Sequence, residues 1–149
     1  MYHIITTDEF FNCGLPVSDD ITSAEVEFAV NTVEQYFLYP YLKELLSDII
    51  ENPTQYEDVL EAADGLKQAL YHLTFAYLIY DKIRLTRYSS VIKNDEHSTD
   101  PAFSQVRDIA STHWEIGTSF LLRDCEKLEI DIKKVKRNDL IFNELSYKL

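Results

Sequence analysis

The fold of this chain is decided by a stretch of twenty residues, 66–85, which reads LKQALYHLTFAYLIYDKIRL. Apolar or aromatic side chains occupy nearly every face of the helix that this stretch would form, among them Leu70, Phe75 and Leu78. A helix that is hydrophobic all round lies in the middle of a core. Charged side chains such as Lys67 and Arg84 make the stretch unsuited to a membrane span. It therefore predicts a central helix with other helices packed around it.

A capping signal marks the start of a helix well before this stretch. Thr22 is followed three residues later by Glu25, the capping-box pattern in which each side chain accepts from the other residue's backbone amide. An apolar face then recurs with helical spacing. We expect a helix over 22–38 whose buried face holds Val26, Ala29, Val30, Val33 and Phe37.

Proline residues divide the segment between these two helices. Pro40 has no amide hydrogen and disfavours helical backbone at Tyr39, which predicts a break there and a second, kinked helix over 40–50. Thr54 and Glu57 have the spacing of a second capping box, so another helix is expected to begin there and to be weakened or interrupted at Gly65. The buried stripe of the 40–50 helix is expected to hold Leu42, Leu45, Leu46 and Ile49.

A change of composition follows the central helix. Residues 87–92, RYSSVI, favour extended backbone and residues 94–98 are polar and turn-like, so we expect an extended or hairpin-like loop near 86–99. Asp100 and Pro101 suit the cap and first turn of a last long helix that ends at about Leu128. Its inner face is expected to hold Val106, Ile109, Ala110, His113, Phe120 and Leu121.

These patterns together predict one mostly α domain, a helical bundle of about four main helices. The length of 149 residues suits a single domain, and the scarcity of Gly (3) and Pro (4) favours helices over a β sandwich. We divide the chain into an N-terminal arm (1–20), the bundle (21–128) and an extended C-terminal docking segment (129–149). That last segment should dock on its own bundle or on a neighbouring subunit, because it is too apolar for a free tail. It holds four cations, Lys133, Lys134, Lys136 and Arg137, followed by Leu140, Ile141, Phe142 and Leu145.

Negative charge is concentrated in the first half of the chain. The net charge is −12, and residues 1–80 hold fourteen Asp or Glu against two lysines, whereas the remainder holds twelve of each sign. An acidic surface repels nucleic acid, which argues against a DNA-binding module. The plainer interpretation is a solvated surface that aids solubility.

The sequence contains none of the patterns that would indicate an active site. Glu-x-x-His, HExxH, CxxC and GxxxxGK[ST] are all absent, which argues against di-iron, zinc and P-loop chemistry. Cys13 and Cys125 are expected to be free thiols, and His72 to be a histidine of the core or of an interface. We therefore expect no enzyme, no catalytic residue, no metal and no cofactor.

The order of segments resembles a known family. An N-terminal IITTDEFF (4–11), an acidic capped helix, YPYL (39–42), a long Ala- and Tyr-bearing helix, TRYSSVIK (86–93), STDP (98–101) and a last long helix follow one another. This order resembles the head–tail connector (adaptor, head-completion) proteins of tailed bacteriophages, of the type in Bacteroidales and crAss-like phages. The resemblance covers 4–128. Ser89 and Ser90 stand where the family would have a glycine after the tyrosine, which affects the turn of that loop.

The resemblance implies a structural virion protein of the neck. Such subunits form a homo-oligomeric ring, usually twelvefold, that docks on the portal protein and on another neck or tail protein. DNA passes through the ring as transiting cargo during ejection, and no membrane is involved. The location would be the virion, after assembly in the cytoplasm of the host bacterium. The contact-making residues implied are Arg87, Tyr88, Val91, Ile92, Lys93, Lys133, Lys134, Lys136, Arg137, Leu140, Ile141, Phe142, Leu145 and Tyr147.

The same charge supports an alternative from another class. An acidic interaction protein such as a DNA-mimic inhibitor would occupy a DNA-binding enzyme as a decoy. Such a complex should weaken steeply with ionic strength, whereas a ring packed by apolar segments should not. Ten tyrosines favour an interface in either case, because Tyr buries a large ring and keeps a polar tip.

Overall fold

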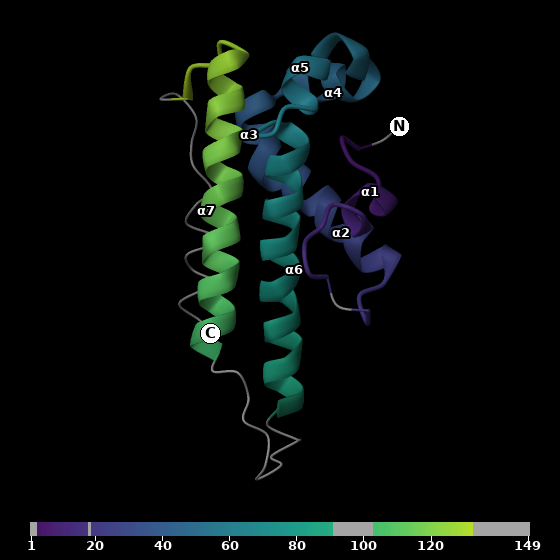
Figure 1. The fold of residues 1–149 in the computed structure, drawn as a ribbon, viewed down its shortest axis with the longest axis vertical. Coiled ribbons are helices and arrows are strands. Elements are labelled where there is room, and N and C mark those ends of the chain that lie inside the picture. The colour runs from purple at the N-terminus through teal and green to yellow at the C-terminus, as the bar shows by residue number, and fades with distance from the viewer. Residues whose placement is uncertain (1–2, 18, 91–102, 133–149) are drawn as a thin grey trace.

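The computed structural model describes residues 3–17, 19–90 and 103–132, with only the backbone described for 81–90 and 103–106. Helices make up most of this part of the chain and it contains no strand, which confirms the mostly α prediction. The two longest helices lie antiparallel and side by side, and the shorter ones gather beside α6 (Figure 1). The elements are α1 (Thr7–Phe11), α2 (Ser23–Val33), η1 (Glu34–Leu38), α3 (Tyr39–Leu42), α4 (Glu44–Glu51), η2 (Pro53–Tyr56), α5 (Glu57–Leu60), α6 (Leu66–Ser90) and α7 (Phe103–Lys127).

Helix α6 is the central helix that the sequence predicted. It packs against α7 along its length and against α2 on another side. Each fully buried Leu-sized side chain contributes roughly 1.5–3 kcal/mol to folding, so this helix holds much of the stability of the domain. Its buried side chains are Leu66, Ala69, Leu70, Tyr71, Leu73, Thr74, Phe75, Ala76, Leu78 and Tyr80.

The N-terminal segment, expected as an arm, contributes to the core. Ile4, Ile5 and Phe10 are all buried. Helix α1 begins with a capping box in which Thr6 and Glu9 exchange hydrogen bonds, in the same way as Thr22 and Glu25 do at the start of α2. The α2 box was predicted, and its predicted buried face is confirmed in full.

The predicted break at Pro40 is wrong. Tyr39 is helical (φ −55°, ψ −40°), and the chain continues as helix from α2 to Leu42. The wider π turn of η1, in which the Tyr39 amide donates to the Glu34 carbonyl, precedes the proline and accommodates its ring and its missing amide. The break falls instead at Lys43, whose φ of 48° ends α3.

The second predicted capping box is also wrong. Pro53–Tyr56 forms a 3₁₀ turn, and α5 begins after Tyr56 without a side-chain cap. Asp48 holds this turn on α4, because its carboxylate accepts hydrogen bonds from Asn52 and Tyr56. The predicted interruption at Gly65 is confirmed: a Cβ there would lie 2.4 Å from the Val59 carbonyl oxygen, so only glycine allows this close approach.

Two expectations for the second half need correction. Residues 86–90 extend α6 and are not extended backbone, because helix propagation from the packed part of α6 overrides their β-type composition; residues 91–99 lie outside the described part. Ile109 is 50% exposed, so it is not on the inner face of α7. Ala110 and Leu121 are buried on that face as predicted, and His113 and Phe120 contact His72 of α6. Trp114, Gly117, Asp124 and Cys125 complete the face.

Candidate partner-binding surfaces

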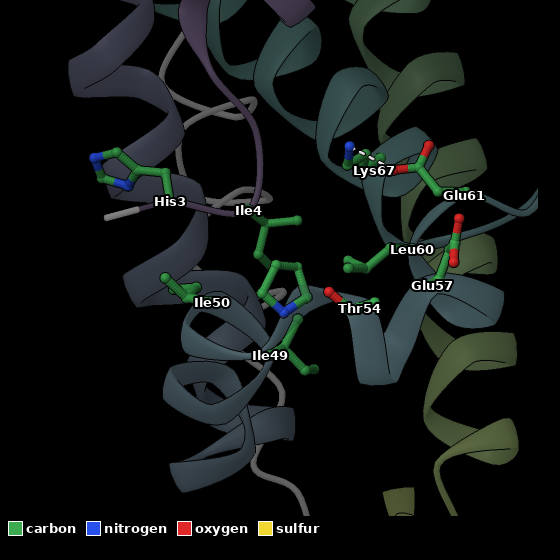
Figure 2. A pocket seen from close by; sticks show the side chains of 10 residues that line it. His3, Ile4, Ile49, Ile50, Thr54, Glu57, Leu60, Glu61 and Lys67 are labelled. Carbon is green, nitrogen blue, oxygen red and sulfur yellow. Dashed lines mark ion pairs between the residues drawn. The ribbon is translucent and has the colours of Figure 1, made fainter. Parts of the chain in front are cut away.

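A cavity of about 290 Å³ lies between the N-terminal segment, α4, the η2–α5 turn and the start of α6. Figure 2 shows its labelled apolar side chains around the hollow, with charged groups from α5 and α6 beside them. The apolar lining consists of Ile4, Ile49, Ile50, Pro53 and Leu60, and the polar lining of His3, Thr54, Glu57, Glu61 and Lys67. We call this cavity the acidic pocket, because its two carboxylates are exposed at its rim.

One wall of the acidic pocket is held in place by a buried glutamate. Glu34, only 1% exposed, accepts a hydrogen bond from the Ile4 backbone amide at 2.8 Å and lies 2.8 Å from Nδ1 of His3. Burial raises the pKa of Glu34, and these two hydrogen bonds only partly offset that effect. The π turn that follows α2 therefore carries the carboxylate that fixes the N-terminal wall of the pocket.

A lysine links the pocket to α1. Lys67 Nζ lies 2.9 Å from Glu9 Oε1 and 2.5 Å from Glu61 Oε1. Burial alone would lower the pKa of Lys67, but the hydrogen bonds to Glu61 and Glu9 outweigh it and raise the pKa well above its usual value. The ammonium is therefore charged at every physiological pH and neutralises one pocket carboxylate. Glu57 makes no ion pair with any residue of the described ranges.

This arrangement suits an amphipathic cationic segment. Apolar side chains can enter the hollow, while cationic groups beside them meet Glu57 at the rim. The next residue on α5, Asp58, does not line the cavity but is also exposed. The volume is at the low end of the roughly 300–1,000 Å³ typical of small-molecule sites, which favours the side chains of a peptide over a large ligand.

A second surface consists of exposed aromatic rings along α2, η1 and α3. Phe28, Tyr36 and Tyr39 are 61%, 56% and 49% exposed. All three lie along the continuous helical stretch from α2 through η1 to α3. We call these three residues the aromatic ridge. Exposed aromatic groups in a row are typical of protein–protein interfaces.

A histidine pair bridges the two long helices. Nδ1 of His72 on α6 lies 2.8 Å from Nδ1 of His113 on α7, and the two rings are stacked with centroids 5.1 Å apart. Phe120 packs edge-on against His72, and Phe75 against His113. Burial lowers the pKa of both imidazoles, and each would further disfavour a charge on the other. One shared proton, donated from one Nδ1 to the other, fits this geometry.

A buried carboxylate lies near the end of α7. Both oxygens of Asp124 are buried without a hydrogen-bond partner, and Lys127 Nζ is 4.0 Å away. Burial raises the pKa of Asp124 to about 7, with Lys127 opposing that shift and Asp64 adding to it. The adjacent Cys125 is a buried free thiol, and its burial raises its pKa to about 12. Its burial and its high pKa indicate a core thiol and not a nucleophile.

The contact residues predicted from the sequence fall mostly outside the described part. Arg87 and Tyr88 belong to the backbone of α6, and their side chains are not described. The remaining twelve, from Val91 to Lys93 and from Lys133 to Tyr147, lie outside it. The acidic pocket and the two hydrogen bonds by which Glu34 holds His3 and Ile4 (the Glu34 clamp) could not be predicted from the sequence, because their members come from five separate segments of the chain. A buried position for Glu34 could have been inferred from its spacing after Val26, Val30 and Val33.

The described ranges contain no cluster of three or more His, Cys, Asp or Glu side chains that could hold a metal ion. Among the helices of those ranges, none is both long and apolar enough to cross a membrane. Comparisons with known protein families, with curated proteins and with solved structures found no match for this chain.

Proposed function

We propose that this chain is a structural subunit of the head–tail connector of a tailed bacteriophage. It would form a ring, twelvefold in the family that it resembles, dock on the portal protein and let DNA pass to the tail. The phage setting rests on the sequence resemblance. The mostly helical architecture agrees with the helical bundle that the resemblance implies.

The observation that carries the assembly role is the aromatic ridge. Phe28, Tyr36 and Tyr39 each leave about half or more of a large side chain in water, which is unfavourable in an isolated domain unless another protein covers it. They lie on a rigid stretch of helix, so a partner would meet them without first ordering a loop. Subunit contacts that are not self-complementary close into a ring when their rotation allows.

The uneven charge supports the same role. All of the excess negative charge lies in residues 1–80, which contribute the aromatic ridge and the acidic pocket, whereas the rest of the chain has equal numbers of acidic and basic residues. An acidic channel wall would repel the passing duplex and so avoid retaining it. The two halves could also attract one another between neighbouring subunits.

Oligomeric state tests this proposal against the DNA-mimic alternative. The purified chain should form closed rings, visible by negative-stain electron microscopy, that persist between about 0.05 and 0.5 M salt. Phe28→Glu should abolish them, whereas Ile109→Glu, at an apolar position on α7 that is 50% exposed, should not. A monomer or dimer that binds a DNA-binding enzyme with steep salt dependence would overturn the ring and support the decoy.

A further inference from the structure

We propose that the acidic pocket is the receptor for residues 133–149 of a second copy of this chain. This inference rests on the proposed ring, since it assigns the contact by which one subunit engages the next. The pocket is formed by residues 3–67 of one subunit. We identify the segment that binds it by the cationic and apolar side chains of its sequence.

The segment carries both kinds of side chain that the pocket can bind. The segment begins with Lys133, Lys134, Lys136 and Arg137 and continues with Leu140, Ile141, Phe142 and Leu145. The pocket offers an apolar hollow built by Ile4, Ile49, Ile50 and Leu60, with acidic side chains along α5. A peptide that inserts its apolar side chains therefore brings its cations to the acidic rim.

The negative charge of the pocket rim favours the cationic segment 133–149 over an uncharged peptide. Glu57 and Asp58 are exposed on the first turn of α5, and Lys67 pairs with Glu61 and Glu9 but contributes only one positive charge. The rim thus keeps a net negative charge. The segment holds the densest run of cations in the chain, four within five residues. In a homo-oligomer, these cations of one subunit can therefore pair with the pocket carboxylates of another.

Hydrogen bonds within the subunit hold two walls of the pocket in place in the absence of a ligand. Glu34 fixes the Ile4 wall, and Asp48 fixes the η2 wall through Asn52 and Tyr56. A receptor whose walls are already held in place loses little conformational entropy on binding.

Carboxyl–amine cross-linking of the full chain tests the proposal. Unlabelled and ¹⁵N-labelled chains are unfolded together, refolded, treated with a zero-length carbodiimide cross-linker and analysed by mass spectrometry. The expected result is a set of links from Glu57 or Asp58 to Lys133, Lys134 or Lys136, with mixed-isotope pairs in statistical proportion. Same-isotope pairs alone would place the segment on its own subunit and overturn the proposal, as would the absence of links at the pocket.

Matched variants separate the pocket from the ring. Glu57→Lys should remove the links and weaken self-association at least tenfold, a change of about 1.4 kcal/mol, whereas Glu27→Lys, the same charge change at an exposed position on α2, should leave both intact. Thr54→Trp, which fills the mouth of the pocket, should act like Glu57→Lys. Rings without pocket links would overturn the receptor and keep the proposed function, whereas pocket links between chains that form only dimers would overturn the ring and keep the receptor.

Discussion

His72 and His113 face one another across the α6–α7 interface with their Nδ1 atoms 2.8 Å apart. The pair is one of the polar contacts between these two helices, with the Tyr80–Ser111 hydrogen bond another, and at most one proton fits between the two nitrogens. Its consequence is a link between pH and the packing of the two long helices.

The histidine pair should make the fold sensitive to mild acid. Since the pKa of both imidazoles is lowered in the folded state, the unfolded state binds more protons below pH 6.5, the ordinary value. Their contribution to stability is therefore complete above that pH and is lost as the pH falls below it. The melting temperature of the wild type, relative to that of His113→Gln, should decrease between pH 7 and pH 5. An equal difference at both pH values would contradict the lowered pKa.

Glu34 should be essential for the N-terminal wall. Glu34→Ala removes the acceptor of the buried Ile4 amide and leaves a cavity, so we expect a loss of about 2–4 kcal/mol in urea unfolding. Glu34→Gln keeps an acceptor for that amide and should cost less. The exposed Glu27→Ala on the same helix serves as the control. Equal losses for Glu34→Ala and Glu27→Ala would show that the clamp contributes nothing.

Gly117 should reject even a methyl group. A Cβ at this position would lie 2.7 Å from Leu73 Cγ and 3.0 Å from the Ala69 carbonyl oxygen, so α6 and α7 would have to separate. We expect Gly117→Ala to destabilise the domain by about 1–3 kcal/mol. At an exposed helical position the same change stabilises by roughly 0.5–1 kcal/mol, so the sign alone distinguishes the two cases. A more stable Gly117→Ala variant would contradict the close packing described above.

Asp124 should oppose stability at alkaline pH. Its folded pKa of about 7 exceeds the ordinary 3.8, so protonation favours the folded state, and that stability is lost as the pH rises through about 7. Asp124→Asn should therefore raise the free energy of unfolding by about 1–2 kcal/mol at pH 8 and by less at pH 5. The free energy of unfolding therefore changes with pH in opposite directions for Asp124 and for the histidine pair. Comparing the wild type with Asp124→Asn and with His113→Gln separates the two contributions. A variant that is less stable than the wild type at pH 8 would show that the carboxylate is paired.

The elements that the sequence predicted correctly are those fixed by local signals. The capping box of Thr22 and Glu25 involves residues three apart, and the apolar pattern of α6 needs no knowledge of its neighbours. The break expected at Pro40 does not occur, because the π turn just before it accommodates the proline ring and its missing amide hydrogen. No local sequence pattern predicts that π turn. The extended backbone expected at 87–90 failed because the packed helix before it propagates.

The candidate surfaces depended on contacts between distant parts of the chain. His72 and His113 are 41 residues apart, and Glu34 holds groups some 30 residues earlier, so neither pairing can be read from spacing. The acidic pocket joins residues from His3 to Lys67. The aromatic ridge was closer to prediction, because the ten tyrosines of the sequence favour an interface. Tyr41, Tyr71 and Tyr80 are buried, whereas Tyr36 and Tyr39 are exposed, and the interface role of the exposed rings stays a prediction.

Antibody-gold labelling of intact phage particles that carry this gene tests the central claim most directly. The proposed role predicts gold at a single vertex, between head and tail, in electron micrographs. Particles without label, with the protein present only in the lysate of infected cells, would contradict a structural role in the neck.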